Sequence, residues 1–474
     1  MNSLVEEFSE FEKREDLFGR TYLGYAYWQS LRTDVYQTSV MKINGFQLSR
    51  NKRIRQKLIA LFRLLLFAGK QIFCHQKIRP CDIILMDHRA GGDRFFDYWN
   101  LPKDITWTKI NDSVNTGNLS WKDKNNLILP YIRCLIALCR KKILHRMERD
   151  IDEVQFLQEL EKKLKKRYGI AKSVKQMEDI ILRSREMDHV YEKYFDKLFE
   201  KSGCKAVVVV CYYNTVLYPA YKAARKKGIR VIELQHGSIN YHNSYWFEDQ
   251  RGINNLTPDY LLAWGKMHIS ETKLLPNTRA VAVGFPYQER MLQKLSPVET
   301  EEKTIIIYPT QSREFERVIN ECAERLAPLG YRIVMKIHPL QVKDYGLRYP
   351  VLSKSPYLEI VTDQSKGIYY WLKVGTFHIV AHTTVGLEAI AFPNAKVCVA
   401  QNIPHDQNEV LLKNGLARGF STADELVGLV MEHSKMNTDD LRDDFWKKNP
   451  CQNIKKFFAR MKQQNWPSGL DYQE

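Results

Sequence analysis

Short apolar runs separated by helical patterns dominate the chain from about residue 205 to residue 400. One series predicts a helix over 215–227 and strands over 205–210, 230–234, 260–264 and 280–283. A second series predicts a helix over 314–326 and strands over 304–308, 332–337, 358–361, 378–381 and 396–399. Strands that are apolar throughout and alternate with helices indicate parallel sheets covered on both faces. The sequence therefore predicts an α/β protein.

A polar, acidic stretch at residues 295–303 separates the two series and predicts a domain boundary. With a further strand at 82–88, the first series forms a domain over 81–300, and the second forms one over 301–440. Two doubly wound, Rossmann-like domains face each other across a cleft lined by the loops at the carboxyl ends of their strands. The 474-residue chain also has room for a helical N-terminal extension over 1–80, a charge-rich helical insertion over 138–201 and a C-terminal helix packing across the domains over 441–474.

The charge balance favours an anionic partner. Lys and Arg outnumber Asp and Glu by 72 to 55, which gives a formal net charge of +17. Such an excess attracts nucleic acid, an acidic glycan, a phosphorylated donor or a membrane surface. The stretch 57–70 is apolar, interrupted by Arg63 and flanked by basic residues. It predicts either a helix that lies on an anionic membrane or one that packs on the N-terminal domain.

The expected location is the cytoplasm. No apolar run approaches the ~20 residues needed to cross a bilayer, and the first residues carry no basic-then-apolar signal. The nine cysteines are scattered, without a CxxC pair or histidines at zinc-binding spacing, which is typical of reduced thiols. A peripheral contact with the inner face of the cytoplasmic membrane is expected if residues 57–70 bind lipid.

The first candidate site is the turn Gln235-His236-Gly237, which follows the strand 230–234. Gly237 frees the backbone to turn. The imidazole of His236 can donate a hydrogen bond or act as a base near neutral pH, although a histidine that only braces the turn is the simpler alternative. Other carboxylates expected near the same cleft are Asp87, Asp93, Glu248 and Asp249.

A second turn, Lys336-Ile337-His338-Pro339, ends its strand in the second domain. Proline cannot continue the hydrogen-bond ladder, so His338 is expected at the end of the sheet. As a single residue, His338 could equally cap its own loop.

A third turn, His382-Thr383-Thr384, lies between a buried strand and a helix start. Unpaired N–H groups at a helix start can hold a phosphate, and the threonines add hydroxyl donors. Glu388 lies about 6 Å further along the helix axis, a distance that suits a ribose hydroxyl. Alone, this turn is equally typical of a simple helix cap. Three polar turns converging on one cleft favour a nucleotide site.

The three turns resemble motifs of bacterial surface-polysaccharide glycosyltransferases of the two-domain GT-B type, which include sialyl- and Kdo-transferases. Those enzymes share a His-Pro motif, matched by His338-Pro339, and a Ser/Thr-rich motif, matched by His382-Thr383-Thr384. The Gln235-His236-Gly237 turn and residues 258–265 look like the corresponding part of capsule-type and polyol-phosphate transferases. The resemblance covers roughly residues 205–415 and implies a GT-B-like fold.

The resemblance also implies roles for individual residues. His338, Thr383 and Thr384 would bind the nucleotide or phosphate of the donor, and Glu388 would hold its ribose. The acidic-acidic-glycine tripeptide that supplies the base in the sialyltransferases does not occur in this sequence. The candidate bases are therefore His236, Asp87 and Asp93, followed by Glu248 and Asp249. Because hydrogen-bond donors would compensate the charge of the leaving phosphate, neither a metal nor another cofactor is expected.

The predicted function is transfer of a sugar from a nucleotide-activated donor, with a CMP-sugar favoured over a UDP-sugar. The acceptor would be a bacterial surface polysaccharide or lipopolysaccharide, free or lipid-linked. A transferase of CDP-glycerol or CDP-ribitol would use much the same residues, whereas a sugar 2-epimerase would need catalytic carboxylates beyond Glu388. A non-catalytic nucleotide- or nucleic-acid-binding protein is the alternative from another class. The basic residues lack aromatic interleaving, so no nucleic-acid partner is expected.

Overall fold

The computed structural model describes residues 4–32, 34–35, 62, 66, 69, 79–87, 101–111, 127–143, 149–239, 256–270, 278–295, 297–381, 383–401, 408–432 and 443–463. Several predictions concern positions outside the described residues: most of 57–70, the side chain of Asp87, and Asp93, Glu248, Asp249 and His382.

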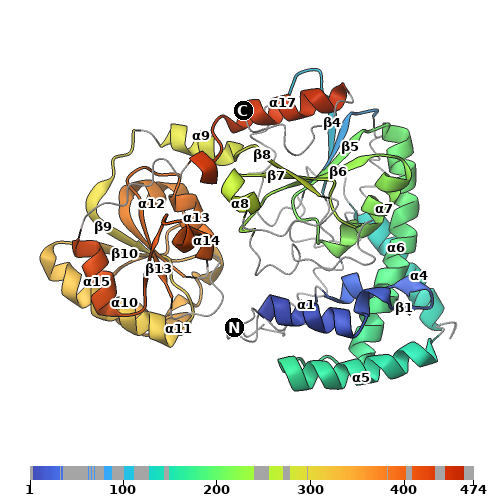
Figure 1. The fold of residues 1–474 in the computed structure, drawn as a ribbon, viewed down its shortest axis with the longest axis horizontal. Coiled ribbons are helices and arrows are strands. Elements are labelled where there is room, and N and C mark those ends of the chain that lie inside the picture. The colour runs from blue at the N-terminus through green and yellow to red at the C-terminus, as the bar shows by residue number, and fades with distance from the viewer. Residues whose placement is uncertain are drawn as a thin grey trace.

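Two parallel sheets of six strands each form the body of the protein (Figure 1). The first has the order β4-β3-β5-β6-β7-β8 and the second the order β11-β10-β9-β12-β13-β14. The strands of the first sheet are β3 (Ile83–Asp87), β4 (Trp107–Asn111), β5 (Ala206–Val209), β6 (Arg230–Leu234), β7 (Tyr260–Ala263) and β8 (Arg279–Ala282). Those of the second are β9 (Glu301–Ile307), β10 (Arg332–Lys336), β11 (Glu359–Val361), β12 (Gly375–Val380), β13 (Lys396–Ala400) and β14 (Arg418–Phe420). The predicted GT-B-like architecture of two doubly wound sheets is confirmed.

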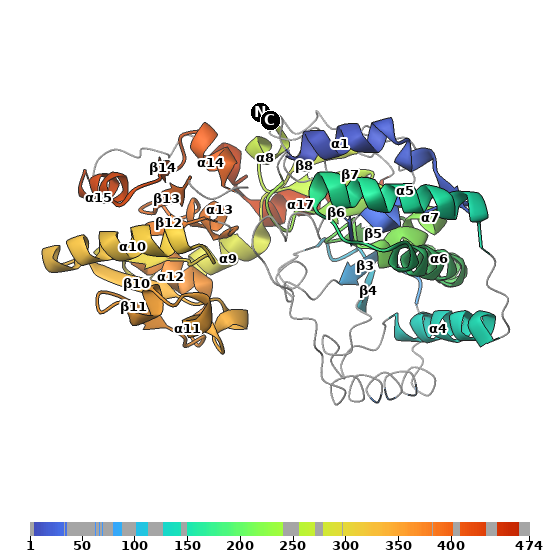
Figure 2. The ribbon, with the colours of Figure 1, turned by 90° about the horizontal axis from the view of Figure 1, so that it is seen from below.

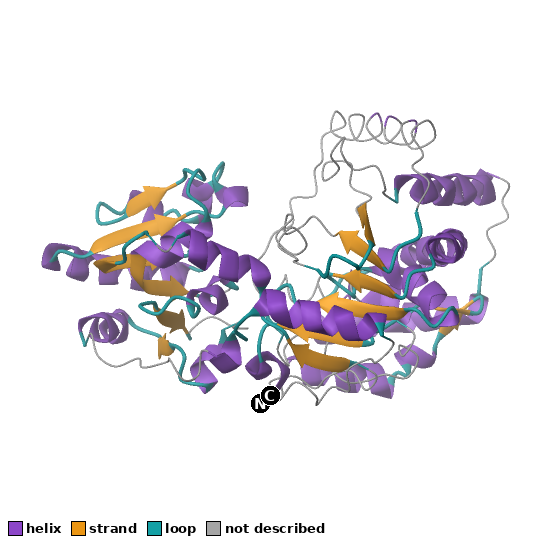
Figure 3. Ribbon diagram, turned by 90° about the horizontal axis from the view of Figure 1, so that it is seen from above, coloured by secondary structure: helices purple, strands orange, loops and turns teal. Residues whose placement is uncertain are grey.

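Helices cover both faces of each sheet (Figure 3). On one face of the first sheet lie α6 (Val174–Ser202) and α7 (Tyr218–Lys226), and α17 (Pro450–Lys462) lies on the other. The second sheet is covered by α10 (Arg313–Leu326) and α15 (Ala423–Met431) on one face and by α12 (Ile368–Val374) and α13 (Val385–Ala389) on the other. Burial on both faces explains why the strands are apolar without alternation.

Shorter elements complete the two sheet units. They are α8 (Lys266–Ser270), α9 (Pro286–Lys294), α11 (Tyr345–Arg348), α14 (Glu409–Lys413) and the 3₁₀ turns η4 (Thr215–Leu217), η5 (Ala327–Leu329), η6 (Pro339–Gln341) and η7 (Leu352–Lys354).

The C-terminal helix α17 returns from the second sheet to the first (Figure 1). The ring of Phe457 meets the ring of Tyr260 edge-on at a centroid distance of 5.4 Å. The helix predicted over 441–474 begins later in the structure, because α17 starts at Pro450 and Asn449 has a positive φ of 57°. A residue that precedes proline is disfavoured in the helical region, which explains the break.

The described N-terminal residues include a short hairpin that was not predicted. After α1 (Leu4–Arg14) and η1 (Leu17–Gly19) come the short antiparallel strands β1 (Thr21–Tyr22) and β2 (Tyr25–Ala26). The sequence pattern missed this hairpin because its four strand residues are too few to show a period. Buried aromatic side chains of this part pack on α5 (Ile151–Tyr168) and on the first half of α6.

The helix α6 links the N-terminal part to the first sheet. Its first half, with Met177 and Ile181, joins the N-terminal core, and its second half, with Tyr191 and Phe195, joins the core of the first sheet. Another helix, α4 (Ile128–Ile143), packs along α6. Figure 2 shows α1, α5 and α6 gathered at one side of the first sheet. The helix α6 therefore takes part in both cores, and Gln29 adds a hydrogen bond from the N-terminal part to the Tyr218 hydroxyl of α7 at 3.2 Å.

Each sheet has one point at which its strand order reverses. In the first sheet this point lies between β3 and β5, and in the second it lies between β9 and β12. Ligands of open α/β sheets bind outside the carboxyl ends of the strands at such points. The loops after β3, β5, β9 and β12 are therefore the expected positions of a ligand-binding site.

Candidate active site

A buried amide holds the turn that carries His236. Gln235 is 2% exposed. Its Oε1 accepts a hydrogen bond from the Trp264 backbone N–H at 2.8 Å, and its Nε2 donates to the Gly237 carbonyl at 2.9 Å. The same Nε2 lies 3.2 Å from Nδ1 of His268, whose burial lowers its pKa to about 3 and keeps it neutral. The turn after β6 is thereby fixed to the end of β7.

His236 lies between a tyrosine and a buried glutamate. Its Nε2 is 3.1 Å from the Tyr213 hydroxyl, and its Nδ1 is 3.7 Å from Oε1 of Glu233. The His236 side chain is 30% exposed, whereas that of Glu233 is 1% exposed. The imidazole can therefore reach solvent on one side, and the buried carboxyl group of Glu233 lies on the other.

Glu233 occupies the fourth position of β6, in an otherwise apolar run. Its Oε1 accepts a hydrogen bond from the Tyr212 backbone N–H at 3.3 Å, and its Oε2 has no partner among the described residues. Burial raises the pKa of Glu233 well above its ordinary value, because a charge in an apolar surrounding loses hydration. Neither Glu233 nor Tyr213 is among the predicted site residues. A carboxylate inside a β-strand of Val, Ile and Leu was the available signal.

The loop that carries Tyr213 lies at the reversal point of the first sheet. It follows β5, next to the carboxyl end of β3, where Asp87 is the last strand residue. Met86 is paired with Val209 of β5, so the backbone of Asp87 lies level with the start of the tyrosine loop. Asp87 thus lies in the predicted part of the sheet, although its carboxylate is outside the described atoms.

A second buried amide holds the threonine turn of the second sheet. Asn408 is fully buried, and its Nδ2 donates to the carbonyls of Ala381 at 2.8 Å and Thr383 at 3.1 Å. A Cβ at Gly386 would lie 2.4 Å from Asn408 Oδ1, so only glycine fits there. Thr383 Oγ1 accepts from the Val385 N–H at 3.3 Å, and Thr384 precedes α13 without capping it by its side chain.

Glu388 lies on α13 and is buried. It is close to Tyr308, which follows β9 at the reversal point of the second sheet. Burial, and then the charge of Glu388, raises the pKa of the Tyr308 hydroxyl well above its usual range. Because α13 has only five residues, its dipole is weak. An anion at this turn would therefore depend more on the hydroxyl and N–H groups of the turn than on the helix dipole.

Lys336 and His338 differ in their surroundings. The Lys336 ammonium donates to the Asp363 carbonyl and to Gln364 Oε1, both at 2.9 Å, so it fixes the loop after β11. His338 is exposed beside Pro339, and its Nδ1 accepts from the Leu340 N–H at 3.2 Å. Partial burial and the neighbouring Lys336 lower the pKa of His338. The neutral ring therefore carries its proton on Nε2, where it can donate to a ligand.

The turns of the two sheets approach each other at Gly237. A Cβ placed on Gly237 would lie 3.9 Å from Cγ2 of Thr384. The loop after β6 of the first sheet is thus in van der Waals reach of the loop after β12 of the second. Two of the three predicted turns are brought together directly, and the His338 turn follows β10, the strand beside β9 in the same sheet.

Aromatic rings join the two sheet units beside this contact. The indole of Trp446 stacks on that of Trp264 at a centroid distance of 4.9 Å and donates from Nε1 to the Leu387 carbonyl of α13 at 3.2 Å. Gly284 has a φ of 88°, and the backbone at Lys447 packs directly against it. A Cβ at position 284 would lie 2.3 Å from the Lys447 carbonyl oxygen. Residues 443–449 thereby connect the end of the first sheet to α13.

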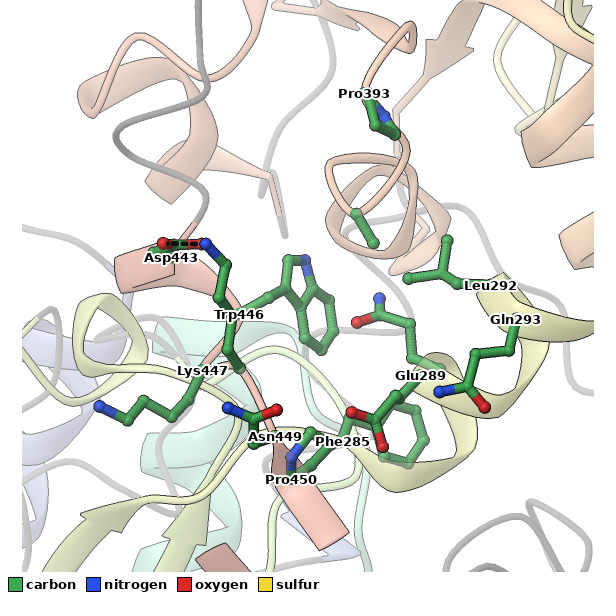
Figure 4. Close-up of a pocket in the computed structure, with 13 residues that line it drawn as sticks. Phe285, Glu289, Leu292, Gln293, Pro393, Asp443, Trp446, Lys447, Asn449 and Pro450 are labelled. Carbon is green, nitrogen blue, oxygen red and sulfur yellow. Dashed lines mark ion pairs between the residues drawn. The ribbon is translucent and has the colours of Figure 1, made fainter. Parts of the chain in front are cut away.

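A pocket of about 540 Å³ lies against this connecting segment (Figure 4). Its walls come from α9, from the chain before β13 and from residues 443–450, and Trp446 lies at its centre. None of the predicted site residues lines it. Size alone does not make it the active site, because the chemistry-bearing side chains gather at the carboxyl ends of the strands.

The described residues hold no group of three or more His, Cys, Asp or Glu side chains arranged for a metal ion. The one Asp-x-Asp sequence, Asp150-Ile151-Asp152, starts α5, where Asp150 caps the helix by accepting from the Glu153 N–H at 3.2 Å. Within the same residues no helix is long and apolar enough to span a membrane.

Neither protein-family models nor curated proteins match the sequence. Solved structures resemble it in fold. A UDP-N-acetylglucosamine 2-epimerase is 10% identical over 82% of this chain and 98% of its own, with a TM-score of 0.47. The UDP-GlcNAc 2-epimerase of Methanocaldococcus jannaschii is 14% identical over 60% and 81%, with a TM-score of 0.40. The glycotransferase of kitacinnamycin is 13% identical over 60% and 83%, also with a TM-score of 0.40. At these identities the likeness concerns the fold alone.

Proposed function

We propose that the protein transfers a sugar from a nucleotide-activated donor to a bacterial surface polysaccharide or lipopolysaccharide acceptor. The observation that carries this proposal is the approach of the Gly237 turn to Thr384, whose Cγ2 would lie 3.9 Å from a Cβ at position 237. It joins a loop with a candidate base to a loop rich in hydrogen-bond donors. A transferase needs both functions within a few ångströms of one reacting carbon, because bringing reactants together is itself a large part of catalysis.

The second sheet would bind the donor. Thr383 and Thr384 lie after β12, beside the reversal point, and the Nε2 proton of His338 is available at the end of β10. These groups would donate hydrogen bonds to the phosphate as negative charge develops on it, so that no metal is required. Glu388 would reach the ribose only if the turn opens, since its carboxylate is buried.

The first sheet would bind the acceptor, and His236 would promote removal of its hydroxyl proton. The imidazole is accessible on one side and lies at the carboxyl end of β6. A base there would face a donor held by Thr384. The formal charge of +17 supports an anionic glycan or a lipid-linked one at the inner membrane face as the acceptor.

The motif resemblance favours a CMP-sugar donor, with a UDP-sugar as the alternative. The released nucleotide distinguishes them: CMP indicates a CMP-sugar or a CDP-polyol, which product mass separates, and UDP indicates a UDP-sugar. A 2-epimerase would convert a nucleotide sugar without any acceptor and without releasing nucleotide. A non-catalytic nucleotide-binding protein would bind nucleotide but turn over none of these donors.

The first experiment measures thermal stability with CMP, CDP, UDP and GDP, followed by nucleotide release from the matching donor. A ligand at 100 times its Kd should stabilise the protein by about 2.7 kcal/mol. His338→Ala should weaken the stabilising response and, through the lost bond from the Leu340 N–H, lower the unliganded melting temperature only slightly. The matched control is His189→Ala, another exposed histidine, on α6 with Lys193 as its neighbour. Equal responses in native protein and His338→Ala would contradict the role of His338, and no response to any nucleotide would contradict the proposed function.

A further inference from the structure

The pocket beside residues 443–450 has a wall of stacked aromatic rings. Trp446 and Phe285 both line it. The indole of Trp264 stacks on Trp446 at a centroid distance of 4.9 Å and on Phe285 at 5.2 Å, so both rings are held from behind. The Trp446 Nε1 already donates to the Leu387 carbonyl of α13. The wall therefore offers apolar ring surface in a fixed position.

A buried glutamine adds an amide to this pocket. Gln288 lies in the first turn of α9, lines the pocket and is 4% exposed. Its Nε2 is buried and has no hydrogen-bond partner among the described residues. Such a group lowers stability, because it has lost its bonds to water and has gained none in return. A ligand that accepts a hydrogen bond would supply the missing partner.

The charged side chains of the pocket wall balance one another. Glu289 and Asp443 are acidic, and Lys447 and Lys448 are basic. Asp443 Oδ2 lies 2.6 Å from Lys448 Nζ, an ion pair drawn as a dashed line in Figure 4. A cleft attracts anions when its walls carry an excess of positive charge, and this lining has none. The walls therefore favour an uncharged ligand over a phosphate or a carboxylate.

Two more side-chain amides line the pocket. Gln293 and Asn449 are both exposed, and Figure 4 shows them on α9 and just before α17. An amide can donate and accept, so it pairs well with hydroxyl groups, whereas a lipid chain would leave it without a partner. The volume of about 540 Å³ lies within the range of small-molecule sites. An apolar ring face with a hydroxyl-bearing edge is the shape that these walls complement.

We propose that this pocket is a second binding site, separate from the candidate active site, that takes an uncharged mono- or disaccharide. The rings of Trp446 and Phe285 would pack on the C–H face of the sugar, and the amide of Gln288 would bond one of its hydroxyl groups. Because α9 follows the first sheet and Pro393 belongs to the second, a bound sugar would contact both sheet units. The site does not depend on the proposed transfer reaction.

Saturation-transfer NMR tests binding, with the methyl glycosides of glucose, galactose and N-acetylglucosamine and with maltose and lactose as probes. At least one of them should bind the native protein, and its signal should persist in excess CMP or UDP. Gln288→Met keeps the length of the side chain and removes the amide, so it should weaken binding of that sugar about tenfold. Gln158→Met, at an exposed glutamine of α5, is the matched control and should bind as the native protein does.

A second readout needs no sugar. Gln288→Met should raise the melting temperature of the unliganded protein by about 1–3 °C, because it removes a buried amide without a partner, and Gln158→Met should leave it unchanged. A lower melting temperature in Gln288→Met would overturn the proposal, since the amide would then be paired within the protein.

Three results of the binding experiment would also overturn the proposal. They are the failure of every probe sugar to bind, displacement of the sugar by nucleotide, and equal affinity of Gln288→Met and native protein. Sugar binding that is retained in CMP or UDP and lost in Gln288→Met, by a protein that turns over no donor, would support the second site. That result would count against the proposed function alone.

Discussion

The two turns that meet at Gly237 and Thr384 are built on the same plan. Each follows a parallel strand at its carboxyl end, and each is held by one buried amide side chain that bonds the backbone of its own turn. Gln235 does this in the first sheet and Asn408 in the second. Such an arrangement fixes a polar loop at the surface of a parallel sheet without any secondary structure of its own.

The turns differ in what lies behind them. Behind the first are the imidazole of His236 and the buried carboxylate of Glu233, so that the turn can accept and hold a proton. The second presents hydroxyls and backbone N–H groups, and the loop after β10 in the same sheet carries a neutral His338. A group that removes a proton needs a charge that changes, whereas groups that steady a leaving phosphate need only fixed donors. The difference between the turns therefore matches the two halves of a transfer reaction.

The largest effects should come from removing the two amides. Gln235→Ala removes the amide partners of the Trp264 N–H and the Gly237 carbonyl. Asn408→Ala removes the amide bond to the Thr383 carbonyl and one of the two bonds to the Ala381 carbonyl, which still accepts from the Thr383 N–H at 3.1 Å. At about 1–3 kcal/mol for each group left unsatisfied, Gln235→Ala should lose about 2–6 kcal/mol of unfolding free energy and Asn408→Ala about 1–3 kcal/mol. Urea denaturation followed by circular dichroism measures the loss.

A matched control is Asn414→Ala, which removes the amide bond to the Val410 carbonyl and should cost about 1 kcal/mol. Below their melting temperatures, Gln235→Ala and Asn408→Ala should also differ in function. Gln235→Ala should retain the nucleotide response and lose turnover, whereas Asn408→Ala should lose the nucleotide response. If both variants lost both properties equally, the division of labour between the turns would be wrong.

A smaller effect concerns the charge behind the first turn. Burial raises the pKa of Glu233 above its ordinary value of 4.5, so the folded protein keeps a proton that the unfolded chain releases. The stability contributed by that proton is complete below about pH 4.5 and is lost as the pH rises through the raised pKa. Glutamine does not titrate, so the stability of Glu233→Gln does not fall in this way as the pH rises. Between pH 5 and pH 8 the variant should therefore gain stability relative to the native protein, by at most about 1.4 kcal/mol per pH unit.

Urea midpoints of both proteins at pH 5, 6, 7 and 8 give this difference, in which the other titrating groups cancel. A difference that stays constant with pH would mean that Glu233 is ionised throughout and that its burial is compensated by a partner. The second turn supplies the contrast, since Thr384→Val should show no such dependence on pH.

Much of the fold could be predicted because its signal is local. Apolar runs such as 230–234 and 396–399 coincide with β6 and β13 to within one residue. The strands β4 and β14 were missed, since Trp107–Asn111 mixes polar with apolar residues and Arg418–Phe420 is only three residues long. Both are edge strands, where one side of the ladder is unpaired and the apolar pattern is weak.

The site was predictable only in part, because its supporting residues are distant in sequence. His236 and Thr384 stand out in their turns, but Asn408 lies 24 positions after Thr384 and is linked to that turn only by the fold. Tyr213 precedes His236 by 23 positions and meets it because β5 and β6 are neighbours. The local sequence around such residues therefore gives no signal of the turn that they contact.

The smallest effects should separate the two threonines of the second turn. Thr383 Oγ1 already accepts the Val385 N–H, so Thr383→Val should mainly cost stability, by about 1 kcal/mol, as for a lost cap. Thr384 makes no such cap and faces Gly237, so Thr384→Val should leave stability unchanged and weaken nucleotide binding about fivefold, the value of one neutral hydrogen bond near 1 kcal/mol. Calorimetric titration with the nucleotide selected by the thermal screen measures the binding of both variants, and urea denaturation measures their stability. If Thr383→Val weakened binding more than Thr384→Val, the donor would lie nearer Thr383 than the approach of Thr384 to the Gly237 turn implies. The two turns would then not act on one reacting carbon.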